Sequence, residues 1–158
     1  MRIHLGSDHA GFNFKKSLGE HLKKAGYEVV DHGADVFDPD DDYPAPCINA
    51  ARAVVADPGS LGFVLGGSGN GEVIAANKVK GTRAALIWST ETAELARQHN
   101  DANIASIGAR MHDLATALEL ADTFVNTKFS NGERHIRRIK QLAEFEATGV
   151  TWQVDPVD

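Results

Sequence analysis

The sequence predicts an α/β fold: a five-stranded parallel sheet with helices on both faces, which makes a three-layer α/β/α sandwich. Strand-like and helix-like segments alternate five times along the 158 residues, with short connections between them. Short connections and right-handed crossovers turn such an alternation into a parallel sheet with a helical layer on each face. The length suits one domain, which we expect to span residues 1–148, followed by a loosely ordered tail at 149–158.

Five segments have the pattern of strands. A short apolar run that ends in Gly-Ser and an alternating segment closed by His-Gly give the first two, at residues 1–7 and 27–31. The run Leu-Gly-Phe-Val-Leu at 61–65 is typical of a buried strand. The last two strands are expected at 83–88 and 103–107.

Helices are expected between and after these strands. Apolar residues recur at helical spacing over residues 10–25, and Gly26 suits the end of that helix. Ser89 is a suitable N-cap for a helix that extends to about residue 100. Further helices are expected at 46–56, at 72–78, from 112 onward and at 132–148, whereas the Asp- and Pro-rich stretch 35–44 is expected to be a loop.

Cysteine content and charge exclude several classes of protein. The single cysteine, Cys47, excludes an intrachain disulfide and the paired thiols of zinc or redox sites, and it suits a cytoplasmic protein. A formal net charge of −6 argues against nucleic-acid binding. No apolar run approaches the roughly 20 residues of a membrane span, and the first residues lack the apolar segment of a secretory signal. The net acidity nevertheless includes a basic stretch at 134–140.

Three polar clusters follow strands whose carboxyl ends a parallel sheet brings to one edge. Asp8 and His9 follow the first strand, a glycine-rich segment at 66–71 follows the third, and Arg110 follows the fifth. Ligands of open α/β sheets bind in the crevice at this edge. The sequence therefore predicts a ligand site there.

The glycine-rich segment has the composition of an anion-binding turn. Four of the residues 66–71 are glycines, which let backbone N–H groups approach an anion at the positive end of a helix. The segment lacks the Lys-Ser/Thr of a Walker A loop and fits a dinucleotide fingerprint poorly. The alternative is a tight strand-to-helix turn without a ligand. Glu72 comes next, either as a partner of the helix dipole or as a general base beside oxyanion donors, the pair that proton abstraction next to a carbonyl needs.

Histidines and arginines further along the chain complete the candidates. His99 either interacts with the end of its own helix or is an acid–base group at the rim of the crevice. Arg134 and Arg138, at i and i+4, share a helix face that is either solvated or, together with Arg110, suited to a phosphate dianion. Other histidines lack metal-ligand spacing and are expected to be structural or solvated: His4, His21 and His32.

Several of these motifs together resemble a known family. Gly-Ser-Asp-His-Ala-Gly at 6–11, the loop 66–72 with Ile-Ala-Ala-Asn-Lys at 74–78, Arg-Gln-His-Asn at 97–100 and Gly-Ala-Arg at 108–110 occur in the order found in the type B ribose-5-phosphate isomerases of the RpiB/LacAB sugar-phosphate isomerase family. The resemblance covers residues 1 to about 146. It implies a flavodoxin-like or Rossmann-like fold that binds no nucleotide, and a homodimer with active sites at the subunit interface. It also implies interconversion of ribose 5-phosphate and ribulose 5-phosphate through a cis-enediolate, without a metal or organic cofactor.

The resemblance implies a role for each candidate residue. His99 would assist ring opening, and Ser68 would either relay a proton or orient the base. The substrate would be bound by Asp8, His9, Gly67, Ser68, Gly69, Asn70, Gly71, Asn100, Arg110, Arg134 and Arg138. Part of this set is expected to come from the neighbouring subunit.

One position departs from the common pattern of the family. Many members have a catalytic cysteine at the first position of the loop, where this chain has Gly66, and Cys47 does not match that position. Glu72 follows the loop directly, so the chain resembles the actinobacterial-type subgroup in which a glutamate is the base.

Alternatives remain at this point. The same chemistry could act on erythrulose 4-phosphate, allose 6-phosphate or galactose 6-phosphate. The chain could instead be a non-catalytic sugar-phosphate sensor, a nucleotide-binding module or a flavoprotein, because fold does not fix function. The sequence also leaves open whether dimers pair into tetramers.

Overall fold

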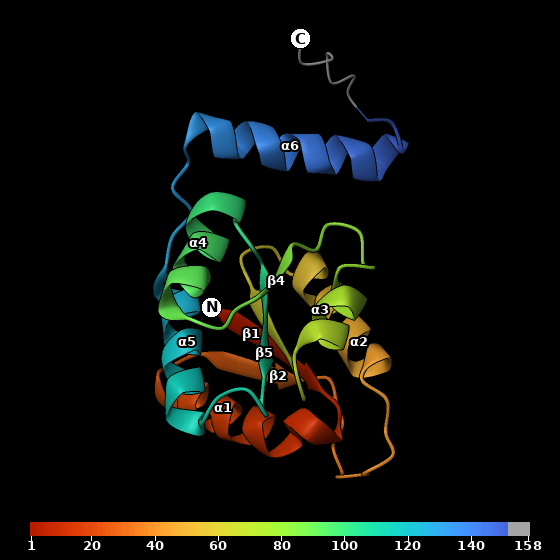
Figure 1. Cartoon of the computed structure of the whole chain (residues 1–158), viewed down its shortest axis with the longest axis vertical. Coiled ribbons are helices and arrows are strands. Elements are labelled where there is room, and N and C mark those ends of the chain that lie inside the picture. The colour runs from red at the N-terminus through yellow and green to blue at the C-terminus, as the bar shows by residue number, and fades with distance from the viewer. Residues whose placement is uncertain (152–158) are drawn as a thin grey trace.

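The computed structural model describes residues 1–151 and contains a five-stranded parallel sheet (Figure 1). The strands are β1 (Arg2–Ser7), β2 (Glu28–Asp31), β3 (Leu61–Gly66), β4 (Ala84–Leu86) and β5 (Ile104–Gly108). They lie in the order β2-β1-β3-β5-β4, and every neighbouring pair is parallel. This arrangement confirms the predicted fold class and places β1, β3 and β5 side by side.

Helices cover both faces of the sheet. On one face α1 (Phe12–Lys24), which follows the short 3₁₀ turn η1 (His9–Gly11), packs with α4 (Thr90–Asn100) and α5 (Leu114–Asn126). The other face is covered by α2 (Pro44–Ala56) and α3 (Asn70–Ala76). Successive residues of β3 point to opposite layers, because Phe63 joins the first core and Val64 the second.

Some boundaries differ from those expected. α3 begins at Asn70 instead of residue 72, because Gly69 takes a positive φ of 82° and the helix starts inside the glycine-rich loop. β4 has three residues instead of the six expected, because the chain after it enters the helix cap: the N–H groups of Trp88 and Ser89 both donate to Thr92 Oγ1 at 3.0 Å. The predicted cap is confirmed, since Ser89 Oγ accepts from Thr92 N.

The last helix lies outside the three layers. In Figure 1, α6 (Glu133–Thr148) lies crosswise above the end of α4, and His135 is its one buried residue. Gly149 ends the helix with a positive φ of 71°, and residues 152–158 of the expected tail lie outside the described residues. Among the helices of residues 1–151, none is long and apolar enough to cross a membrane.

Candidate active site

The three polar clusters meet at one edge of the sheet. Because β1, β3 and β5 are neighbours, the residues that follow their carboxyl ends line one cavity. Its lining is formed by Asp8, His9, Ala10, Tyr43, Gly67, Ser68, Gly71, Glu72, Arg110 and Met111. The predicted crevice is therefore present, and it also contains two side chains that the sequence did not single out, Tyr43 and Met111.

The glycine-rich loop is fixed by contacts with β5 and the turn after it. Arg110 N donates to Gly67 O at 3.0 Å, and the buried Ser106 Oγ donates to Gly69 O at 2.7 Å. Gly69 has a positive φ, and a Cβ on it would lie 3.2 Å from Gly108 N. Only glycine therefore fits this close approach of the two backbones. The loop is ordered in advance, as a loop whose amides stabilise an oxyanion needs to be.

Two side chains border the loop. Ser68 Oγ accepts from the backbone N and from Nδ2 of Asn70, both at 3.3 Å. These bonds order the loop, and both catalytic roles expected for Ser68 stay predictions. Tyr43 precedes α2, and a Cβ on Gly71 would lie 2.6 Å from its Cζ atom. The tyrosine ring therefore closes the cavity on the α2 side.

Glu72 lies buried in the first turn of α3, with 4% of its surface exposed. Its carboxylate occupies the space beside Gly66, where an added Cβ would overlap Oε1 and lie 2.9 Å from Cγ. Glycine at position 66 is therefore what makes room for the acid. Burial raises the pKa of Glu72, and the nearby Asp8 raises it further. A carboxylate with a raised pKa beside a glycine-rich loop is suited to proton abstraction near neutral pH.

The thiol of Cys47 cannot take over that chemistry. Cys47 is a fully buried residue of α2 and belongs to the core on that face of the sheet. Burial raises its pKa well above the ordinary thiol value, and the charges of Glu72 and Asp8 add to this effect. The thiolate is the reactive form of cysteine, so this side chain is inert. Within residues 1–151, no group of three or more His, Cys, Asp or Glu side chains could hold a metal ion.

Asp8 and His9 are positioned by different partners. Asp8 Oδ1 accepts from Ala10 N at 2.9 Å and from Gly11 N at 3.3 Å, so it caps η1. Asp41 Oδ1 accepts from the backbone N of His9 at 2.7 Å and contacts its Nδ1 at 2.9 Å. The Asp41 contact raises the pKa of His9, which favours an imidazolium whose Nε2–H can bind an anion. Asp41 was not among the residues predicted from the sequence, although the excess of Asp in the loop 35–44 was a signal for it.

Topology separates the other predicted residues from this cavity. α4 begins after the carboxyl end of β4 and ends before β5 begins, so its last residues lie at the opposite edge of the sheet. Arg83, just before β4, confirms this placement because its Nε donates to Asn100 O at 2.9 Å. Within one chain His99 therefore does not line the cavity that contains Glu72, and its expected acid–base role stays a prediction.

At that opposite edge, α6 brings His99 and the basic residues together. The ring of His135 lies against that of His99, with centroids 4.2 Å apart. Arg134 Nε donates to His135 Nε2 at 3.0 Å, and Arg138 lies one turn further along α6. The chain thus carries two groups of predicted site residues. One group contains Glu72 and Arg110, and the other contains His99, Asn100, Arg134 and Arg138.

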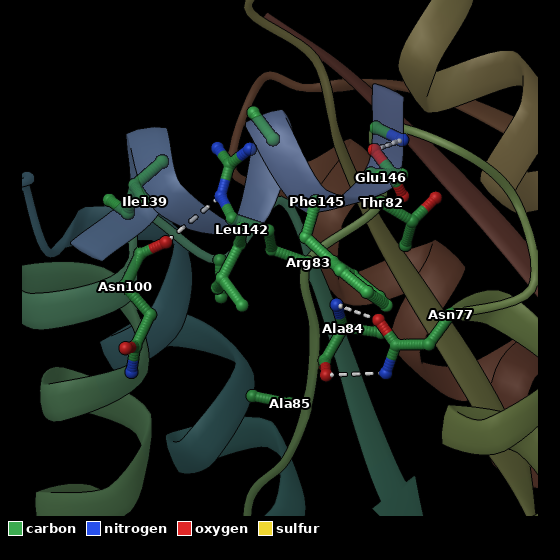
Figure 2. A pocket seen from close by; sticks show the side chains of 13 residues that line it. Asn77, Thr82, Arg83, Ala84, Ala85, Asn100, Ile139, Leu142, Phe145 and Glu146 are labelled. Atoms are coloured by element: carbon green, nitrogen blue, oxygen red, sulfur yellow. Dashed lines mark hydrogen bonds between the residues drawn. The ribbon is translucent and has the colours of Figure 1, made fainter. Parts of the chain in front are cut away.

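A pocket with an apolar rim lies between α6 and the edge strand β4. In Figure 2, Leu142 and Phe145 of α6 face Ala84 and Asn77 across the pocket. Leu142 and Phe145 are strongly exposed for apolar residues, with exposed fractions of 60% and 45%. Glu146 Oε2 accepts from Gly81 N at 2.8 Å and holds the far end of the helix.

Curated relatives match nearly the whole chain. Ribose-5-phosphate isomerase B of Mycobacterium leprae is 60% identical over 148 residues, which cover 94% of this chain and 91% of the relative. The enzyme of the same name from Mycobacterium tuberculosis H37Rv matches with the same identity and coverage.

Solved structures show the same fold. The ribose-5-phosphate isomerase B of Mycoplasma genitalium, solved with bound ribulose 5-phosphate, superposes with a TM-score of 0.90 at 40% identity, over 93% of this chain and 97% of the other. The enzyme of Trypanosoma cruzi gives a TM-score of 0.89 at 38% identity, over 94% and 99% of the two chains. The model of the ribose/galactose isomerase family matches residues 3–142. Because this family model covers most of the chain and relatives reach 60% identity over nearly its whole length, the chain belongs to the ribose/galactose isomerase family.

Proposed function

We propose that this protein is a ribose-5-phosphate isomerase that interconverts ribose 5-phosphate and ribulose 5-phosphate. The observation that carries the proposal is the buried Glu72, with its raised pKa, next to the ordered glycine-rich loop. Aldose–ketose isomerisation needs this pair, because a base must take a proton from carbon while donors stabilise the enediolate oxygen. The relatives named above support the choice of a five-carbon substrate.

The reaction runs in two stages. The arginines and His9 bind the phosphate, and His99 moves the protons that open the furanose ring. Glu72 then takes the C2 proton, which can exchange with solvent while it is on the carboxyl group, and delivers a proton to C1, while the loop amides stabilise the oxygen of the cis-enediolate. Such donors contribute up to about 3–4 kcal/mol each in well-studied enzymes. No metal or organic cofactor takes part in this scheme.

We infer that the working enzyme is a homodimer with shared active sites. In one chain His99, Asn100, Arg134 and Arg138 lie at the edge of the sheet opposite Glu72, so a second copy would have to supply them. The exposed apolar residues of α6 and the pocket beside it support an interface at this end. A two-fold axis makes both sites complete at once. We place the enzyme in the cytoplasm, where the unpaired Cys47 suits a reducing environment.

A panel of phosphorylated sugars tests the activity. Turnover is measured on four-, five- and six-carbon substrates, including ribose 5-phosphate, erythrulose 4-phosphate, allose 6-phosphate and galactose 6-phosphate, in deuterated water. The proposal expects the highest kcat/KM on ribose 5-phosphate, with deuterium appearing in the product. Preference for another sugar would reassign the substrate. Binding without exchange would identify a sensor instead of an enzyme.

Complementation between two inactive variants tests the shared site. Glu72→Gln and His99→Asn each inactivate a different half of the site, and the two chains are co-expressed or refolded together. If the halves come from different chains, each mixed dimer has one intact site, and a random mixture regains about a quarter of the wild-type activity. If each site lies within one chain, mixing restores nothing.

A further inference from the structure

His135 stands out on α6 because it is buried on an otherwise exposed or half-buried helix. It is 6% exposed, and its ring lies against that of His99 with 4.2 Å between centroids and an angle of 46° between planes. None of the motifs assigned so far includes it. A buried histidine that contacts both a proposed acid–base group and a proposed phosphate ligand needs an explanation of its own.

The hydrogen bonds of His135 determine its protonation. Arg134 Nε donates to His135 Nε2 at 3.0 Å, and a guanidinium has no acceptor. Nε2 must therefore lack a proton, so that the ring is neutral and its single proton is on Nδ1. The Nδ1–H group then donates a hydrogen bond to Ser130 Oγ, 3.0 Å away. Burial lowers the pKa of His135, and the facing groups His99, Arg134 and Arg138 lower it further. A backbone hydrogen bond at Gln98 has the opposite effect and raises this pKa.

This tautomer has consequences for both neighbours. Arg134 is held through Nε, so its two terminal nitrogens are oriented as a pair, the geometry that binds a phosphate through two bonds. An ordered guanidinium also loses less conformational entropy when the ligand arrives. His99 packs on the neutral ring of His135, which fixes its position.

We propose that His135 is a positioning residue that orients Arg134 for the phosphate and His99 for ring opening through its Nδ1–H tautomer. The role rests on the proposed function, since it acts through two residues of that site. Ser130 takes part in the same arrangement because its Oγ accepts the hydrogen bond from Nδ1–H of His135.

Two substitutions separate the contacts of the ring. The amide of Gln reaches the place of Nε2, so His135→Gln keeps an acceptor for Arg134. The amide of Asn reaches only the place of Nδ1, so His135→Asn keeps the bond to Ser130 and loses Arg134. Neither variant keeps the ring that packs on His99. We therefore expect kcat to fall in both variants, whereas the KM for ribose 5-phosphate rises roughly tenfold in His135→Asn and less than about threefold in His135→Gln.

Three further readouts distinguish positioning from a structural role. His21→Asn removes a comparable histidine contact, to Asp122 at 2.8 Å, and should leave KM unchanged. In an Arg134→Ala background, His135→Asn should raise KM no further, because the two residues act as one unit. Nitrogen NMR should show a neutral His135 ring with its proton on Nδ1 near pH 7. The NMR measurement does not depend on turnover. A calorimetric titration of the wild type and the variants with inorganic phosphate, which measures phosphate affinity, does not depend on turnover either.

The outcomes are distinct. Equal KM values for the Asn and Gln variants, or an Nε2–H tautomer, would overturn the inference even with a fully active wild type. Wild-type protein without turnover on any sugar phosphate would refute the proposed function, whereas the NMR and phosphate-binding results would still decide the role of His135. If His135→Asn does not fold, Ser130→Ala takes its place: a roughly threefold weaker phosphate affinity supports the inference, and an unchanged affinity contradicts it.

Discussion

Replacing Gly66 by alanine should inactivate the enzyme without unfolding it. A Cβ at this position would overlap Glu72 Oε1, whereas ordinary contact begins at about 3.4 Å. The carboxylate must therefore withdraw by more than about 1 Å, a displacement that can lower kcat by about 100-fold. Overpacking of this kind should also lower the free energy of unfolding by roughly 1–3 kcal/mol.

The assay is isomerisation of ribose 5-phosphate, combined with thermal unfolding of each variant. Gly19→Ala is the matched control, because its Cβ would lie 3.4 Å from Leu5 and the helix position is unstrained. The control should keep wild-type kcat. The double variant Gly66→Ala/Glu72→Ala should regain stability but not activity, because the overlapping carboxylate is gone. A folded Gly66→Ala enzyme with wild-type kcat would refute this account of the Glu72 position.

Further predictions concern charge and pH. Glu72→Gln should lower kcat by about 10²–10⁴-fold. In the wild type, the acidic limb of the kcat/KM profile should lie above the ordinary glutamate pKa of 4.5, because burial raises the pKa of Glu72 and the base must be ionised. An acidic limb at or below 4.5 would contradict the role of Glu72 as the base. Asp41→Asn should lower the pKa of His9, so that KM begins to rise at a lower pH than in the wild type; identical KM profiles would count against His9 as a phosphate ligand. Burial lowers the pKa of both His4 and His32 in the folded protein, so the stability that their neutral rings contribute is fully present above about pH 6.5 and is lost as the pH falls from there through the lowered pKa values. The urea midpoint should fall less between about pH 7 and 5 in His32→Asn than in the wild type, and parallel curves would show that this pair does not titrate.

Much of the crevice could be predicted because it depends on chain order. Residues that follow parallel strands always reach the same edge, so Asp8, Glu72 and Arg110 had to come near one another once their strands were neighbours. Asp41 and Tyr43 could not be placed in the same way. They belong to an irregular stretch before α2, whose path depends on packing and not on a local period.

His99 shows where reasoning from local motifs fails. Its motif is read correctly as the end of a helix, but the helix runs antiparallel to the strands and carries His99 about 14 Å, at about 1.5 Å per residue, to the opposite edge. The family resemblance implies a role for His99 but does not give its distance from Glu72. This separation in one chain is what makes a second copy part of the proposal.

The sequence by itself determined the alternation of strands and helices, the glycine-rich loop after β3 and the presence of glycine, not cysteine, at position 66. These features are local, since they depend on hydrophobic period, glycine and the identity of single residues. Only the tertiary structure decided that Gly66 makes room for Glu72, that Asp41 pairs with His9 and that His135 links His99 with Arg134. Each of these contacts joins side chains through space, and their formation depends on strand order and helix direction, which no local pattern encodes.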